Sequence, residues 1–265
     1  YYKFKKGIED SSSNFLIWNW EHLSRAYAAL GIEDSAIYYF NFLKSKYGYN
    51  IGYLSLRMYI PLKNNKIWQS YFDSCRISYC RENPTKNFNY VNSLSTIQSD
   101  DMFYRACLAS NYEIMDARTM NKYMYNQNNI DSINSIKVDS LINIFGFPTI
   151  KTTGSFGVKC AFLKIQHSKI DMQLKYQTQI ENAFKNGELD NESYAKYVDR
   201  ILVNTNCPQR YGTQYWYDDI DKKNYIFPVE DEYKINELRK KMSLIPIEDF
   251  CKSKLKSESV IYKNK

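Results

Sequence analysis

Apolar positions recur at helical spacing in two runs within residues 20–47. The runs are broken at Gly31, and Asp34 or Ser35 is available to cap the second one. This pattern predicts a helical hairpin. Residues 54–79 continue with helical spacing, so further helices are expected to pack beside the hairpin.

The segment 82–95 is rich in Asn and Ser and contains one Pro, which suits a connection between two domains. Beyond it, apolar spacing predicts one helix from about residue 95 into the 120s and a second over 131–145, which Gly146 ends. A loop is predicted over 148–157, because this stretch contains Pro and two glycines.

A long helical pattern over 158–186 follows and is closed by Gly187. A shorter one is capped at Asp190 or Asn191 and runs to about residue 204. The short connection predicts an antiparallel pair of helices.

The character of the chain then changes to β-type runs. Residues 211–217 and 224–227 are rich in aromatic and β-branched residues and are separated by an acidic turn, which predicts a β-hairpin. Helices are predicted over 233–242 and 247–252, before a basic tail.

The first hairpin resembles the tetratricopeptide repeat, a helix–turn–helix unit that stacks into arrays. The residues that fall at the offsets of the repeat are Trp20, Leu23, Tyr27, Ala36 and Phe40. Ser24 and Gly48 stand where Gly and Pro are usual. Since a lone repeat cannot bury its own apolar face, residues 1–92 are predicted to form a short array of hairpins of tetratricopeptide type. The alternative is that they are packing helices of a larger α-helical domain.

An ordered series of short motifs runs through the second half of the chain. It comprises Asp101 with Arg105, Asp131 with Asn134, Gly146-Phe147-Pro148-Thr149, Gly154 with Gly157, Gln166-His167 with Asp171, Asp199-Arg200, Pro208-Gln209-Arg210-Tyr211-Gly212-Thr213-Gln214, Pro228 with Glu230-Asp231, and Arg239 with Leu244 and Pro246. This series resembles the bacterial domain-of-unknown-function family 6624 over about residues 94–250, and the resemblance implies no activity. Met102 stands where that family has Gln. The predicted organisation is 1–92, 93–251 and a basic tail, 252–265, in a mainly α fold with a small β-hairpin.

Four residues of the second half form a candidate catalytic set. His167 and Asp171 are four residues apart on the predicted long helix, so a carboxylate would lie beside the imidazole and fix its tautomer for general-base catalysis. Asp199 and Arg200 lie on the next helix, which antiparallel pairing would bring opposite. The structural alternative is that His–Asp and Asp–Arg contacts tie helices together.

A second set of residues is predicted to bind an anionic or amide-bearing ligand. Its members supply carboxylate, guanidinium, amide and hydroxyl groups. They are Asp101, Arg105, Gln166, Gln209, Tyr211, Thr213 and Gln214. Gly154 and Gly157, just before a predicted helix, would add backbone donors for an anion.

Composition and charge narrow the function classes. The formal charge is +7, but the Lys-rich ends carry it and the body over residues 7–251 is neutral, so nucleic-acid binding is not expected. Contact of the ends with an anionic lipid surface stays open. No apolar run is long enough to span a bilayer. Two histidines and no CxxC exclude the common zinc sites, so neither a metal nor a cofactor is expected.

Two features bear on the compartment. The chain begins at Tyr1 without Met, which indicates a removed leader or a trimmed sequence. Together with the Tyr- and Asn-rich composition, this favours the cell envelope or export over the cytoplasm. The six cysteines fit either disulfides or buried thiols.

Two functions remain. The first is an interaction or accessory protein that binds a protein or peptide partner through its helical hairpins, with Trp20, Tyr27 and Phe40 as the contacting residues. The absence of the P-loop, Rossmann, HExxH and nucleophile-elbow motifs favours it. The alternative is a metal-independent hydrolase or group transferase built on His167, Asp171 and Arg200.

Overall fold

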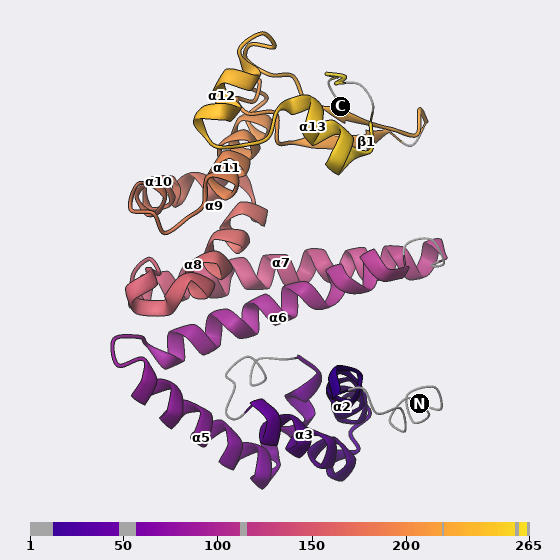
Figure 1. Ribbon diagram of the computed structural model, residues 1–265, viewed down its shortest axis with the longest axis vertical. Helices are drawn as coiled ribbons and strands as arrows, with labels where there is room; N and C mark the ends of the chain where they lie inside the picture. The colour runs from indigo at the N-terminus through magenta and orange to yellow at the C-terminus, as the bar shows by residue number, and fades with distance from the viewer. Residues whose placement is uncertain (1–12, 48–56, 112–115, 219, 258–259, 264–265) are drawn as a thin grey trace. The chain divides into compact units, whose positions relative to one another are not determined.

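The computed structural model describes residues 13–47, 57–111, 116–218, 220–257 and 260–263. It divides into two compact units, Tyr1–Cys160 and Ala161–Lys265. The fold is mainly helical with one two-stranded antiparallel sheet, as the sequence predicts (Figure 1). The domain boundaries predicted near residues 92 and 251 stay a prediction, because a division by compactness does not test them.

The first unit begins with the predicted helical hairpin. Helices α2 (Ser13–Ala29) and α3 (Glu33–Tyr47) pack against each other around a turn at Gly31, whose φ of +72° suits glycine. The N–H groups of Gly31 and Ile32 donate to the last carbonyls of α2 and so end that helix. The hairpin is confirmed, whereas its tetratricopeptide type stays a prediction.

Two further elements complete the aromatic core of this region. The 3-10 helix η1 (Arg57–Asn64) leads into α5 (Lys66–Glu82), and the side chain of Asn65 caps α5 by accepting from the N–H groups of Ile67 and Trp68. The ring of Phe40 is only 2% exposed and makes edge contacts with neighbouring rings, which fixes α3 against η1 and α5. These rings belong to Tyr59, Trp68 and Tyr71.

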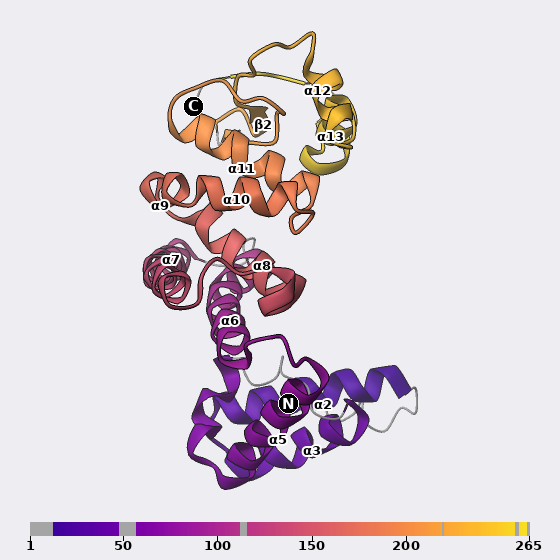
Figure 2. The ribbon, with the colours of Figure 1, turned by 90° about the vertical axis from the view of Figure 1, so that its left-hand side faces the viewer.

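The next two helices both begin earlier than the sequence predicts, and the first also ends earlier, at Asn111 rather than in the 120s. Helix α6 (Phe88–Asn111) begins seven residues before the predicted start, because Asn87 accepts from the N–H of Tyr90 and caps it. Helix α7 (Ala117–Phe145) begins at a cap formed by Asp116, so the predicted start at residue 131 is wrong. The two helices lie side by side (Figure 1, Figure 2). The predicted stop of α7 at Gly146 is confirmed.

The region after α7 departs most from the prediction. Helix α8 (Ile150–His167) occupies most of the predicted loop and is kinked at Gly154, where φ is +76°. Hydrogen bonds between Thr149 and Thr152 start this helix. A Cβ at Gly157 would lie 2.5 Å from the side chain of Thr153, so packing requires this glycine. No contact assigns either glycine the predicted role in anion binding.

The predicted helix over 158–186 is in fact three helices. Helix α8 ends at His167, and α9 (Ile170–Lys175) and α10 (Gln177–Lys185) follow. The buried amide of Gln173 explains the first break, since its Nε2 donates to the backbone carbonyls of Gln166 and Ser168, both at 2.9 Å. Two side-chain hydrogen bonds thus replace the helical partners that these carbonyls would have had.

The second unit is completed by a capped helix, the hairpin and a C-terminal helical layer. Helix α11 (Asn191–Asn204) is capped by Asp190, as predicted. Strands β1 (Tyr215–Asp218) and β2 (Lys223–Ile226) pair with Tyr215 opposite Ile226. Helices α12 (Ile235–Lys241) and α13 (Ile247–Phe250) follow, and a π-helical turn, η2 (Cys251–Leu255), continues α13.

The apolar core of this layer combines β2 with the C-terminal helices. Its buried members are Ile226, Ile235, Ile247, Phe250, Cys251 and Leu255. In the part of the chain that the structure describes, no helix is both long and apolar enough to cross a membrane.

Candidate functional site

One buried carboxylate holds the segment 208–213. Asp199 lies on α11 and has no exposed surface. Its Oδ1 accepts from the N–H groups of Arg210 (2.8 Å) and Tyr211 (2.9 Å), and its Oδ2 accepts from the N–H (2.9 Å) and the hydroxyl (2.8 Å) of Thr213. Burial raises the pKa of Asp199, and the four hydrogen bonds oppose that shift. Because it accepts four hydrogen bonds from this segment, the Asp199 carboxylate holds the segment against α11.

Gln209 fixes the same segment against the hairpin. Its side chain is fully buried, and its Nε2 donates to the backbone carbonyls of Gln214 (2.9 Å) and Phe227 (2.7 Å). Its Oε1 accepts from the N–H of Gln214 at 2.9 Å. Both donor hydrogens of this amide are therefore engaged within the fold. Gln209 positions the segment that carries Thr213 and Gln214, and it has no donor left for a ligand.

A buried guanidinium lies on the other side of this segment. Arg239, on α12, is 2% exposed; its Nε donates to the carbonyl of Ile245 and its Nη1 to the carbonyl of Tyr211, both at 2.6 Å. Its guanidinium carbon lies 5.0 Å from the centre of the Phe250 ring. Burial lowers the pKa of Arg239, although Asp199 opposes the shift. An arginine stays charged at neutral pH even so.

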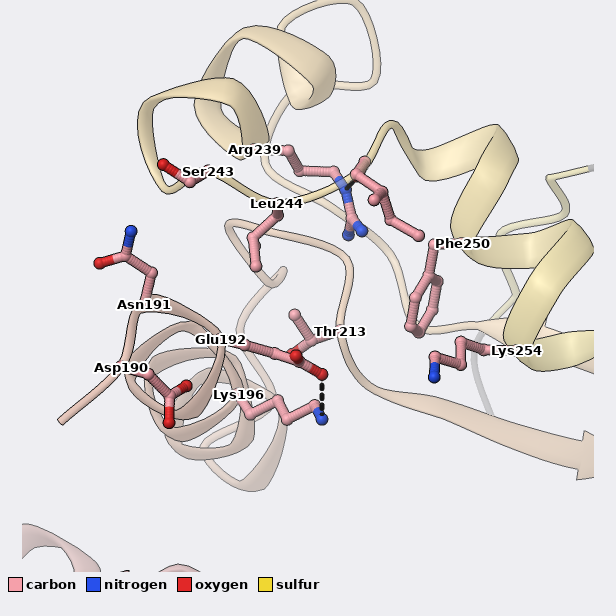
Figure 3. Close-up of a pocket in the computed structure, with 11 residues that line it drawn as sticks. Asp190, Asn191, Glu192, Lys196, Thr213, Arg239, Ser243, Leu244, Phe250 and Lys254 are labelled. Carbon is pink, nitrogen blue, oxygen red and sulfur yellow. Dashed lines mark hydrogen bonds and ion pairs between the residues drawn. The ribbon is translucent and has the colours of Figure 1, made fainter. Parts of the chain in front are cut away.

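The third nitrogen of this guanidinium is not engaged. Nη2 of Arg239 makes no hydrogen bond with any residue that the structure describes, and the group forms no ion pair with those residues. Arg239 also lines a hollow in the second unit, into which Figure 3 shows its side chain pointing. A buried cation therefore presents an open edge to a cavity.

That hollow is one end of an elongated cleft. Two hollows of about 690 and 580 Å³ lie in the second unit. They share five lining residues, so we treat them as one cleft. The shared residues are Glu192, Lys196, Thr213, Phe250 and Lys254. The separate ends are named by their arginines, the Arg239 end and the Arg200 end.

The Arg239 end combines positive charge with an apolar wall. Lys196 pairs with Glu192 at 2.6 Å, the ion pair drawn in Figure 3. Lys254 is exposed and makes no hydrogen bond or ion pair with the residues described by the structure. The carboxylate of Asp190 is occupied by Ser193 of the same cap. The apolar wall is made by Leu244, Ile245 and Phe250.

The Arg200 end brings together several residues that the sequence singles out. Gln166, His167, Arg200, Thr213 and Gln214 all line it. Nε of Arg200 donates to Oε1 of Gln214 at 3.1 Å, and Nε2 of Gln214 donates to the hydroxyl of Thr213 at 3.1 Å. The predicted convergence thus occurs for these five. It does not include Tyr211, whose backbone N–H instead donates to Asp199 and whose backbone carbonyl accepts from Arg239.

The predicted pairing of His167 with Asp171 is not formed. His167 is the last residue of α8, and Asp171 lies in the first turn of α9. Asp171 is exposed and makes no hydrogen bond or ion pair within the described ranges. The expectation of an i,i+4 pair on one helix is wrong because Gln173 ends α8 early. A catalytic role for His167, Asp171, Asp199 and Arg200 stays a prediction.

Asp101 and Arg105 belong to a closed network in the first unit. Arg105 donates from Nε to Asp101 (3.0 Å) and from Nη2 to both oxygens of Asp131 (2.9 Å each). The amide of Gln127 donates to both carboxylates. Burial, and then the neighbouring carboxyl of Asp101, raise the pKa of Asp131, while Arg105 opposes the shift. This network ties α6 to α7, and the ligand-binding role of its members stays a prediction.

The residues predicted to contact a partner are largely engaged in packing. Trp20 stacks on Phe42 with ring centres 4.8 Å apart, and Tyr27 stacks on Tyr39 at 5.7 Å. Both are partly buried, and Phe40 lies in the core. Of the three, only Trp20 and Tyr27 keep exposed surface beyond the 2% of Phe40.

Sequence reasoning assigned no role to several contributors to the cleft, among them Lys196, Arg239, Phe250 and Lys254. Arg239 stands in the ordered motif series, but that series implies no role for it, and Lys240 and Lys241 follow it directly. Among the described residues no group of three or more His, Cys, Asp or Glu side chains is placed to hold a metal ion. Five of the six cysteines are described, and all five are free thiols.

The comparisons with known proteins identify a family. A family model described as a family of unknown function, DUF6624, matches residues 103–261, which is more than half of the chain. The chain belongs to this family. The match covers the whole of the cleft and confirms the resemblance found in the ordered motifs. Searches of curated proteins and of solved structures gave no match.

Proposed function

We propose that the DUF6624 region binds a small anionic ligand in the cleft. The observation that carries this proposal is the state of Arg239. Its guanidinium is 2% exposed, lines the cleft, and keeps one nitrogen free of any hydrogen bond to the described residues. Binding of this ligand, with or without a later chemical step, is the activity that the geometry supports best.

The cost of burying a charge is the physical basis. An unpaired buried ion costs several kcal/mol of solvation free energy, and an opposite charge with good hydrogen bonds offsets that cost. Two backbone carbonyls supply part of the compensation for Arg239, and the negative charge of Asp199, which opposes the lowering of the pKa of Arg239, supplies more. An anion bound at Nη2 would supply the rest as a charge-assisted hydrogen bond.

The lining indicates that the ligand has an apolar part as well. Leu244, Ile245 and Phe250 flank the guanidinium, and Lys254 adds a second positive charge at the mouth. A volume of about 690 Å³ lies within the range of small-molecule sites, roughly 300–1,000 Å³, and is much more than an inorganic anion fills. A carboxylate attached to a branched hydrocarbon matches these features.

Thermal unfolding of the full chain tests the proposal. The probes are 4-methylpentanoate, its neutral amide and inorganic phosphate, each at matched ionic strength. We expect a saturable rise of the midpoint with the carboxylate and none with the amide, since only a ligand that binds the folded state stabilises it. Equal shifts with acid and amide, or no shift with any anion, would overturn the proposal.

A matched pair of variants locates the effect. Lys196→Gln removes a cation of the cleft, whereas Lys241→Gln removes one that pairs with Glu237 on α12, outside the cleft. We expect the first to weaken the response to 4-methylpentanoate and the second to leave it unchanged. A loss of equal size in both would mean that the response reflects net charge only.

Binding of a protein or peptide partner by the helical hairpins is a second candidate. A hollow of about 240 Å³ in the first unit is lined by Lys44 and Lys66 beside the edges of Phe40 and Trp68. Ile67, which also lines it, is 56% exposed. Positive charge beside apolar surface suits a peptide that carries acidic and apolar residues.

Calorimetric titration of a synthetic peptide of alternating Glu and Leu tests this candidate. Lys66→Glu reverses a charge in the hollow, and Lys63→Glu reverses one that does not line it. We expect only the first to weaken binding. Unchanged binding to Lys66→Glu would remove the hollow as the contact site.

The alternative of a hydrolase or group transferase has weaker support. His167 and Arg200 line the cleft, but Asp171 makes no hydrogen bond that would orient the imidazole among the residues described. The Asp199 carboxylate already accepts four hydrogen bonds. Binding is therefore the function that this arrangement favours over catalysis.

A further inference from the structure

The cleft is asymmetric along its length. At one end the guanidinium of Arg239 is buried, with 2% exposed surface, whereas the other cations of the cleft, Lys196, Lys254 and Arg200, are partly or fully exposed. The two hollows share five lining residues, so the cavity extends from Arg239 toward His167. A ligand that fills it has its charge at one end.

The charge near Arg239 favours a group with one negative charge. One buried cation there has no ion pair with the described residues, and one negative charge balances it. The carboxylates of Asp190 and Glu192 line the same hollow and disfavour a dianion such as phosphate. The planar edge of a guanidinium also matches the geometry of a carboxylate.

The lining changes in order along the cleft. Beside Arg239 the wall is made by Leu244, Ile245 and Phe250, which suits one apolar side chain. Farther on, the wall includes the amide of Gln166, which makes no side-chain hydrogen bond with the residues described, and the side chains of His167 and Arg200. These polar groups suit a chain of amides. The carboxyl-terminal end of a peptide has these features in the same order: a carboxylate, an apolar side chain and then amides.

We propose that the cleft binds the carboxyl-terminal end of a peptide whose last residue is apolar. Arg239 holds the terminal carboxylate, the Leu244–Phe250 wall holds the last side chain, and the chain continues toward His167. This inference rests on the proposed function, since it names the class of anion that the cleft takes. It involves no bond making or breaking.

Binding of acetyl-triglycyl-leucine to the full chain, measured by calorimetry, tests the inference against its carboxyl-terminal amide and against 4-methylpentanoate. We expect the acid to bind at least tenfold more tightly than the amide, because a charged hydrogen-bonded group is lost in the amide. We expect it also to bind several-fold more tightly than 4-methylpentanoate, which lacks the amides.

The outcomes separate the two proposals. If 4-methylpentanoate binds and the peptide acid binds no more tightly, the cleft takes small acids, and the peptide inference falls while the proposed function stands. If acid and amide peptides bind equally, the terminal carboxylate is not recognised and the inference falls. If no acid binds, both proposals fall.

A variant at the far end adds a second test. His167→Ala removes a partly exposed wall residue distant in sequence from Arg239. We expect it to weaken binding of acetyl-triglycyl-leucine at least threefold and to leave 4-methylpentanoate binding unchanged. Lys241→Gln is the control outside the cleft. Equal binding of the peptide to the parent and to His167→Ala would show that the chain does not extend that way.

Discussion

Two buried charges of the second unit hold the backbone of one residue, Tyr211, from its two sides. The carboxylate of Asp199 accepts from the N–H of Tyr211, and the guanidinium of Arg239 donates to its carbonyl oxygen. Asp199 has four donors bound, whereas Arg239 keeps one nitrogen open to the cleft. Burial alone therefore does not identify a binding site. The number of bonding positions left open does.

The largest expected loss of stability comes from changing Asp199, the carboxylate whose four hydrogen-bonding positions are all occupied. Asp199→Asn replaces an acceptor by an N–H₂ group that faces N–H donors, so we expect the free energy of unfolding to fall by about 3 kcal/mol or more. Urea denaturation measures it. Asp171→Asn is the matched control on an exposed carboxylate, with an expected change within about 0.5 kcal/mol. Similar losses of unfolding free energy in both variants would show that Asp199 stabilises the fold no more than an exposed carboxylate does.

Changing Arg239, the guanidinium that keeps one nitrogen open to the cleft, should affect both stability and binding. Arg239→Gln leaves the carbonyls of Tyr211 and Ile245 without their donors, which we expect to cost about 2–3 kcal/mol of unfolding free energy. The same variant should lose the stabilisation by 4-methylpentanoate. A folded Arg239→Gln protein that keeps the full ligand response would show that the guanidinium is structural only.

A cation at the mouth of the cleft should affect binding alone. Lys254 has no ion pair with the described residues, so Lys254→Gln should leave the unfolding free energy within about 0.5 kcal/mol of the parent. Affinity for 4-methylpentanoate should fall about twofold to fivefold, as expected for one exposed charge. Calorimetry at two salt concentrations checks this, and an effect that does not shrink with salt would argue against a charge contact.

The smallest effect concerns the exposed hairpin turn, where water reaches the carboxylates. Backbone hydrogen bonds, then Lys263, lower the pKa of Asp218, and the Tyr225 hydroxyl, then Lys263, lower that of Asp221. For a carboxylate with a lowered folded pKa, the contribution to stability is present above the unfolded pKa, about 3.9, and is lost as the pH falls through the folded pKa. Carboxyl NMR titration should give midpoints below 3.9 for both. Lys263→Gln should raise them, and unchanged midpoints would exclude the lysine as a cause.

Local signals account for the parts of the fold that were predicted correctly. Gly31 and Gly146 end helices because glycine adopts positive φ at little cost, and Asp190 caps α11 through its own side chain. These interactions lie within a few residues of each other, so the sequence contains them whole. The errors are of another kind. Gln173 ends α8 by hydrogen bonds to residues five and seven positions earlier, and Asn204 of α11 fixes its amide from 31 positions away.

The candidate site divides along the same line. The motif residues Gln166, His167, Arg200 and Gln214 do line one cleft. Asp101 and Arg105, four residues apart, do form an ion pair as their spacing suggests. In the first unit, however, Arg105 also binds Asp131. Spacing along a helix predicts which side chains share a face, and it does not tell whether a partner from another helix already occupies them.

By itself, the sequence determined the helical class, the first hairpin, the small sheet and the family, because periodicity, caps, turns and ordered motifs are properties of neighbouring residues. Only the tertiary structure decided which charges are satisfied. Asp199 and Arg239 are both polar residues of the same motif series. Donors from another segment of the chain occupy all four hydrogen-bonding positions of Asp199, whereas Nη2 of Arg239 makes no hydrogen bond with the described residues. That difference depends on through-space distances between carbonyls, N–H groups and charges, which no local pattern encodes.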